Sequence, residues 1–175
     1  MSARRAWHDR IPHDRNPVKP LEHHTAPERL GSAAELLGYL AVAPLIAALA
    51  CVVLLPGYAG RDLAQRAAIA WGAVLLAFAG AVHFGLTLAG RLQAVPWRLA
   101  AAAAPALAAA AAVLVGGQRA LALLVVGCGV FWLYEHRVLG AALPPQYLAL
   151  RRNLSLAICT LLALIMIASD TAGLL

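Results

Sequence analysis

Long uncharged apolar stretches are the feature that most constrains how this chain folds. Hydrophobic residues make up 62% of it and charged residues 13%, whereas soluble domains are roughly half apolar and a quarter charged. An apolar segment of about 20 residues is long enough to cross a bilayer as a helix. The sequence therefore predicts an all-α integral membrane bundle over residues 32–175. Its five transmembrane helices are expected at about residues 33–55, 67–89, 99–115, 120–134 and 154–168.

Residues 1–31 form a polar segment that contains four prolines. Such a segment buries too little apolar surface to fold alone, so we expect a disordered tail. No apolar run follows its first arginines, which argues against a secretory signal. Its acidic residues argue against a mitochondrial transit peptide. We interpret His23 and His24 as solvated side chains rather than metal ligands.

The basic residues indicate an orientation. Eleven Lys and Arg residues fall on the side of the tail, and three fall on the other side, namely Arg61, Arg66 and Arg119. Positive charge concentrates in cytoplasmic segments, so we expect a cytoplasmic N-terminus and a periplasmic C-terminus in a bacterial inner membrane. A mitochondrial inner membrane is the alternative. Topology also explains the net charge of +6, so we predict membrane lipid and no nucleic acid as a partner.

His83 is the one ionisable residue deep in a predicted span. An ionisable group in a membrane is costly, faces protein rather than lipid, and is a candidate for function. A neutral histidine hydrogen-bonded between helices is the competing interpretation. The same helix carries small residues at every fourth position, which share one face and predict a packing surface. These residues are Ala73, Ala77, Ala81, Gly85 and Ala89.

His83 is two residues from both Ala81 and Gly85, which places it on the opposite side of this helix. The second span is therefore expected to be central, with partners on both sides. At the cytoplasmic ends of the spans, Glu135 is the only acid among several arginines. A solvated interfacial ring of charges is one interpretation, since exposed pairs contribute little to stability. The other is a specific buried pair between Glu135 and one of these arginines, and we take His83, Glu135 and Arg151 as the candidate polar site.

The sequence shows no catalytic constellation. It has no second deep histidine for a haem, no carboxylate deep within a span, no Ser/His/Asp set and no phosphate-binding glycine loop. The cysteines Cys51, Cys128 and Cys159 lie singly in different spans, and we expect them to be buried apolar residues. We therefore predict no catalytic residue, no bound metal and no cofactor.

Several short motifs occur in a characteristic order. The first is Leu37-Gly38-Tyr39 followed by Pro44. The second is Trp71-Gly72-Ala73-Val74 with Phe78, Gly80, His83, Phe84 and Gly85. The third is Glu135 followed by Pro145, Tyr147, Leu150, Arg151 and Leu154. Together they resemble the "transmembrane protein 69" family of small five-helix membrane proteins, over residues 35–168. That family more often has tryptophan in place of Phe84 and aspartate in place of Glu135. The resemblance implies five spans and supplies no activity.

These observations favour a non-enzymatic inner-membrane protein, an accessory subunit or assembly factor of a larger membrane complex such as a respiratory one. The alternative is a protein that binds or transports a small molecule or lipid, with His83 in a pocket open to the cytoplasm. A membrane enzyme that uses His83 as an acid or base is a third hypothesis.

Overall fold

The computed structural model describes residues 32–90, 92–93, 95–139 and 145–171. The predicted tail, residues 1–31, lies outside this part of the chain. The described residues form helices and no strands, and five stretches are long and apolar enough to cross a membrane. The predicted five-helix membrane bundle is thus confirmed. The helices are α1 (Ser32–Leu40), α2 (Ala43–Leu54), α3 (Tyr58–Leu88), α4 (Pro96–Val115), α5 (Gly117–Tyr134), the π-helix η1 (Glu135–Leu139) and α6 (Pro145–Thr171).

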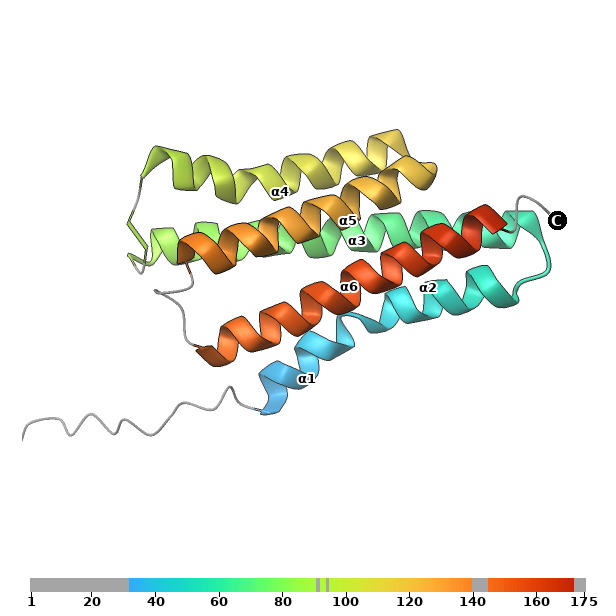
Figure 1. The fold of residues 1–175 in the computed structure, drawn as a ribbon, viewed down its shortest axis with the longest axis horizontal. Helices are drawn as coiled ribbons and strands as arrows, with labels where there is room; N and C mark the ends of the chain where they lie inside the picture. The colour runs from blue at the N-terminus through green and yellow to red at the C-terminus, as the bar shows by residue number, and fades with distance from the viewer. Residues whose placement is uncertain (1–31, 91, 94, 140–144, 172–175) are drawn as a thin grey trace, which may run out of the picture.

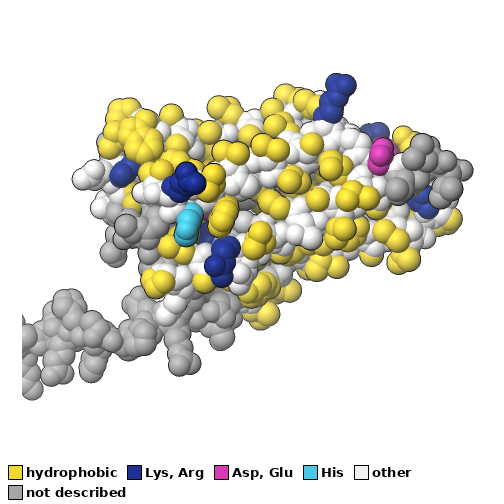
Figure 2. Space-filling model, in the orientation of Figure 1, with side chains coloured by type: hydrophobic (Ala, Val, Ile, Leu, Met, Phe, Trp, Pro, Cys, Tyr) yellow, Lys and Arg dark blue, Asp and Glu magenta, His cyan; other side chains and the backbone are white. Residues whose placement is uncertain are grey.

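The long helices run side by side, and α3 occupies the centre (Figure 1). It packs against α2, α4, α5 and α6, as expected for the second span. The core between these helices consists mainly of alanine, leucine and other aliphatic side chains. The largest of the fully buried side chains include Leu45, Leu76, Leu121, Leu124, Leu162 and Ile165. The outer surface is mostly hydrophobic, as suits contact with lipid tails (Figure 2).

The first span is broken between α1 and α2, just before Pro44. Proline has no N–H and disrupts the helix in the preceding turn. The Leu45 N–H bonds to Val42 O rather than to Ala41 O. The indole Nε1–H of Trp71 on α3 then donates to the Ala41 carbonyl over 2.8 Å. The helix is therefore fully broken before Pro44, and the free Ala41 carbonyl is satisfied by a neighbouring helix.

The central helix α3 begins at Tyr58, well before the predicted start near residue 67. The charged residues near the start of α3 do not interrupt the helix. Asp62 and Arg66 form an i,i+4 ion pair with an N–O distance of 2.8 Å, a spacing that supports a helix. Arg61 Nε donates to the Leu55 carbonyl over 2.7 Å. The helix therefore extends past its apolar segment.

Two helix boundaries follow local chemistry. Gly116 and Gly117 have φ values of 67° and 59°, which glycine adopts without steric cost, and they join α4 tightly to α5. Pro145 begins α6, because the N–H that proline lacks is not needed in the first turn of a helix. The cysteines divide: Cys128 is buried and Cys159 half-buried, but Cys51 is exposed, so the prediction of burial is wrong for Cys51.

Candidate functional site

Three ionisable side chains from separate helices meet near one end of the bundle. Glu135 Oε1 lies 2.6 Å from Nε2 of His83, and Glu135 Oε2 accepts a hydrogen bond of 2.9 Å from Nε of Arg151. The histidine comes from α3, the glutamate from the start of η1 and the arginine from α6. One carboxylate therefore joins three helices. We call these three residues the polar cluster.

The polar cluster is enclosed by protein. His83 is 3% exposed and Glu135 is 1% exposed, while Arg151 is half-buried. A buried charge without a partner costs several kcal/mol, on the order of 3–5 when one partner of a pair is removed. Here the glutamate and arginine charges compensate each other, and both carboxylate oxygens are hydrogen-bonded. The arrangement makes an acid tolerable inside a membrane bundle.

The local backbone at Glu135 is unusual. Helix α5 changes to a π-helix at this residue, and the π-helix continues to Leu139. Such turns are rare, and they occur frequently at functional sites. Glu135 is therefore presented from a specialised turn rather than from a regular helix.

The His83 ring is held from several sides. It makes an edge-to-face contact with the Phe131 ring, with centroids 5.2 Å apart and an interplanar angle of 68°. The carboxylate accepts hydrogen bonds only, so Nε2 carries the proton in this pair. The other ring nitrogen, Nδ1, is buried without a hydrogen-bond partner among the described residues. A carboxylate that orients an imidazole is the arrangement of a general base, but here the other ring nitrogen is buried.

The structure brings together all three residues that the sequence singled out at this end: His83, Glu135 and Arg151. The pairing of Glu135 with an arginine was one of two interpretations of the sequence, and Arg151 is the partner that the structure shows. The contact between His83 and Glu135 was not, because the two residues are 52 positions apart. The signal that points to it is depth: His83 is near the end of the second span, and Glu135 is near the same end of the fourth.

The predicted packing stripe on α3 needs a correction. Ala73 is buried and Ala77 is half-buried, but Ala81 and Gly85 are exposed, with nothing within 4 Å of a Cβ added at Gly85. Within the chain, the buried face of α3 near the polar cluster instead contains Gly80, His83 and Thr87. The sequence placed His83 and the stripe on opposite sides, and the structure does so as well. It is the histidine side that packs inside the bundle.

A buried glycine shows how close this packing is. A Cβ added at Gly80 would overlap the carbonyl oxygen of Ala102 on α4. The two backbones approach this closely because neither side chain fills the space between them, which is the usual reason for small residues between membrane helices. Next to this contact, Thr87 Oγ1 donates to the His83 carbonyl over 2.9 Å and stays within its own helix.

Comparison with known proteins gives a family and no further relatives. Neither the curated proteins nor the solved structures contain a match to this chain. Residues 31–167 match the family described as "Protein of unknown function (DUF3429)". The matched region contains the polar cluster and most of the membrane-spanning helices. The chain is therefore a multi-pass membrane protein that belongs to the DUF3429 family.

Proposed function

We propose that this protein is a non-enzymatic membrane subunit that assembles with a larger membrane complex through the outward face of α3. We place it in the bacterial inner membrane, with the N-terminus in the cytoplasm and the C-terminus in the periplasm. An accessory or assembly role in a respiratory complex is the specific form of the proposal. It draws on the resemblance to the transmembrane protein 69 family, which is shared by bacteria and mitochondria.

The observation that carries the proposal is an outward-facing small-residue surface on α3. Ala81 and Gly85 are exposed and one helical turn apart, and Ala77 extends the same row. Exposed large side chains border them, including Phe78 at 66% and Leu88 at 72% exposed. Small residues at four-residue spacing let a second helix approach closely, and close packing drives helix association in lipid. We call Ala77, Ala81 and Gly85 the outer small-residue row.

The polar cluster supports a structural rather than a catalytic role. Both oxygens of Glu135 are engaged by His83 and Arg151, so the carboxylate is committed to holding three helices together. This fixes α3 from its inner side. A rigid helix loses little freedom when a partner binds its outer side, and such preorganisation favours association.

The test is purification of the full chain from its native membranes in a mild detergent, followed by mass spectrometry of co-purifying subunits. We expect at least one membrane protein at a constant ratio. Replacement of Gly85 by Leu should remove it, whereas Ala110→Leu, at an exposed position of α4, should retain it. A monomer without a co-purifying subunit would contradict the proposal, as would a Gly85→Leu variant that keeps its partner.

Ligand binding at His83 is the second candidate function, and the unpartnered Nδ1 of His83 favours it. On this hypothesis Nδ1 binds part of a small molecule or lipid headgroup that enters from the cytoplasm. His83→Ala should then abolish binding or transport and leave the co-purifying subunits in place. If the variant changes only the melting temperature, the imidazole has a structural role.

A further inference from the structure

An apolar groove lies on the outer surface between α4 and α5. Its volume is about 260 Å³. The α4 residues that line it are small, and α5 contributes a glycine, so the space between the two helices stays unfilled. The lining includes Ala101, Ala104, Ala108, Gly127, Val130 and Tyr134. Ala104 is exposed and Val130 is 62% exposed, so the groove opens outward. From Tyr134 to Gly127 it extends about 10 Å along the helix, at about 1.5 Å per residue.

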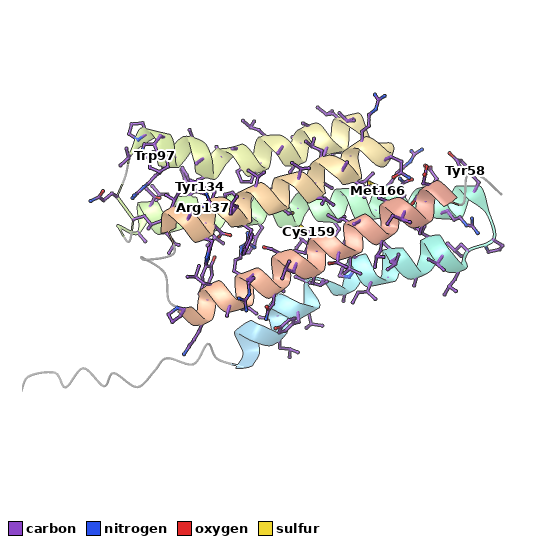
Figure 3. All side chains as sticks on the ribbon, viewed as in Figure 1. Tyr58, Trp97, Tyr134, Arg137, Cys159 and Met166 are labelled. Carbon is purple, nitrogen blue, oxygen red and sulfur yellow. The ribbon has the colours of Figure 1, made fainter. Side chains whose placement is uncertain are left out.

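The groove has a polar end. Tyr134 lines the groove and makes an edge-to-face contact with the Trp97 ring, with centroids 6.3 Å apart. The guanidinium carbon of Arg98 lies 5.3 Å from the centre of that same tryptophan ring. Trp97 and Tyr134 appear together at one end of the bundle in Figure 3. An aromatic pair and a cation thus mark the end of an otherwise apolar groove.

Arg98 is positioned toward this groove and forms no ion pair with any acid in the part of the chain that the structure describes. It is one helical turn before Ala101 and two turns before Pro105, so the three share one face of α4; Ala101 and Pro105 line the groove. The Nε atom of Arg98 is buried and has no hydrogen-bond partner within the described part of the chain. The acid of the polar cluster, Glu135, is already bound by His83 and Arg151.

We propose that this groove binds one anionic phospholipid, with an acyl chain between α4 and α5 and the phosphate at Arg98. A guanidinium presents forked donors that match a phosphate, and the bond is strengthened by charge. Tryptophan and tyrosine concentrate at the level of lipid headgroups. Basic pockets between membrane helices are known sites for anionic headgroups. A neutral lipid offers Arg98 no net compensating charge.

This site is separate from the outer small-residue row and from the proposed assembly role. It adjoins the polar cluster at Phe131, which lines the groove and also contacts the His83 ring. A bound acyl chain would therefore touch the side chain that packs against the imidazole. Lipid binding and the integrity of the polar cluster are thus linked by a direct contact.

The first experiment measures lipid selectivity. The full chain is purified in detergent, stripped of lipid and supplied with phosphatidylglycerol or phosphatidylcholine, and bound lipid is counted by native mass spectrometry. We expect one phosphatidylglycerol to be retained. Arg98→Gln should weaken its binding about tenfold, whereas Arg152→Gln, an exposed arginine at the same end, should leave it unchanged. Equal retention of the two lipids, or an unchanged Arg98→Gln variant, would overturn the proposal.

The second experiment locates the acyl chain. Phosphatidylglycerol with a brominated acyl chain should quench the fluorescence of Trp97. The Trp97→Phe variant shows which part of the total tryptophan fluorescence comes from Trp97. Ala104→Leu fills the groove and should reduce the quenching, while Ala103→Leu, exposed but outside the lining, should not. Unchanged quenching with Ala104→Leu would overturn the proposal. So would a dimer that dissociates in this variant, because a second copy would then occupy the groove. Inorganic phosphate should not displace the lipid, and thermal melting of each variant verifies folding.

Discussion

The two sides of α3 carry the same kinds of small residue and use them differently. Gly80 and Gly85 are five positions apart on one helix. At Gly80 an added Cβ would overlap the Ala102 carbonyl, whereas at Gly85 it would meet nothing within 4 Å. A small residue in a membrane helix marks a place where something approaches closely. The comparison teaches that the approaching partner is a helix of the same chain on one side and, in our proposal, another protein on the other.

The largest loss of stability is expected when the polar cluster on the inner side of α3 loses its carboxylate. Glu135→Ala leaves Arg151 and His83 without their shared partner. Removing one member of a buried pair costs about 3–5 kcal/mol, so we expect a fall in the free energy of unfolding of that order. Thermal or denaturant unfolding in detergent measures it. Glu135→Gln, which keeps the shape and one acceptor, should lose less. A stability loss below about 1 kcal/mol, the range of exposed pairs, would show that the polar cluster is solvated.

Gly80→Ala tests steric closeness on the inner side. The added methyl group overlaps a backbone oxygen, which cannot move away as a flexible side chain can. Overpacking of this kind typically costs about 1–3 kcal/mol. The same unfolding measurement applies, and a variant as stable as the parent would mean that α3 and α4 are farther apart than the structure shows.

Trp71→Phe removes one hydrogen bond and keeps most of the ring. The Ala41 carbonyl at the break between α1 and α2 would lose its indole donor. We expect a loss of about 1 kcal/mol, the usual net contribution of a hydrogen bond. The substitution should also speed amide hydrogen exchange more in α1 than in α5, since the bond tethers the α1–α2 break to α3. Equal exchange changes in the two helices would argue against that tether.

The smallest effect is expected for Gly85→Ala on the outer side. The added methyl group meets open space, so the free energy of unfolding should change by less than about 0.5 kcal/mol, as is usual at surface positions. Set beside Gly80→Ala, this variant isolates the contrast between the two sides. A stability loss equal to that of Gly80→Ala would remove the contrast.

The sequence predicts the number of membrane helices because apolar length is a local property. Pro44 and Pro145 likewise act within their own turns, and a helix break and a helix start occur there. The predicted second span starts later than α3 because the charged residues Arg61, Asp62 and Arg66 precede the apolar stretch, although the Asp62–Arg66 pair supports further helix. Periodicity placed His83 and the outer small-residue row on opposite sides. It contains no information on which side meets the rest of the chain.

The site was predicted only in part for the same reason. A lone intramembrane histidine and a lone interfacial acid are each visible in the sequence. Their contact depends on how α3 and α5 are rotated about their axes, and that rotation is set by packing, including the close approach of Leu76 to Gly127 and of Leu124 to Gly72. The groove beside Arg98 could not be predicted from the sequence either, because it forms only where small residues of two different helices face each other.

The polar cluster has a consequence for how the chain is made. Helix α3 is synthesised with His83 before its partner exists, since Glu135 follows 52 residues later and Arg151 another 16 residues after that. A nascent chain that stops before α6 therefore holds an acid in the membrane without its arginine. We expect chains truncated at residue 144 to be degraded faster than the full chain, measurable by pulse-chase labelling, and Glu135→Gln to slow that degradation. In the full chain, pairing of the Glu135 carboxylate with Arg151 would then mark the insertion of α6 as complete.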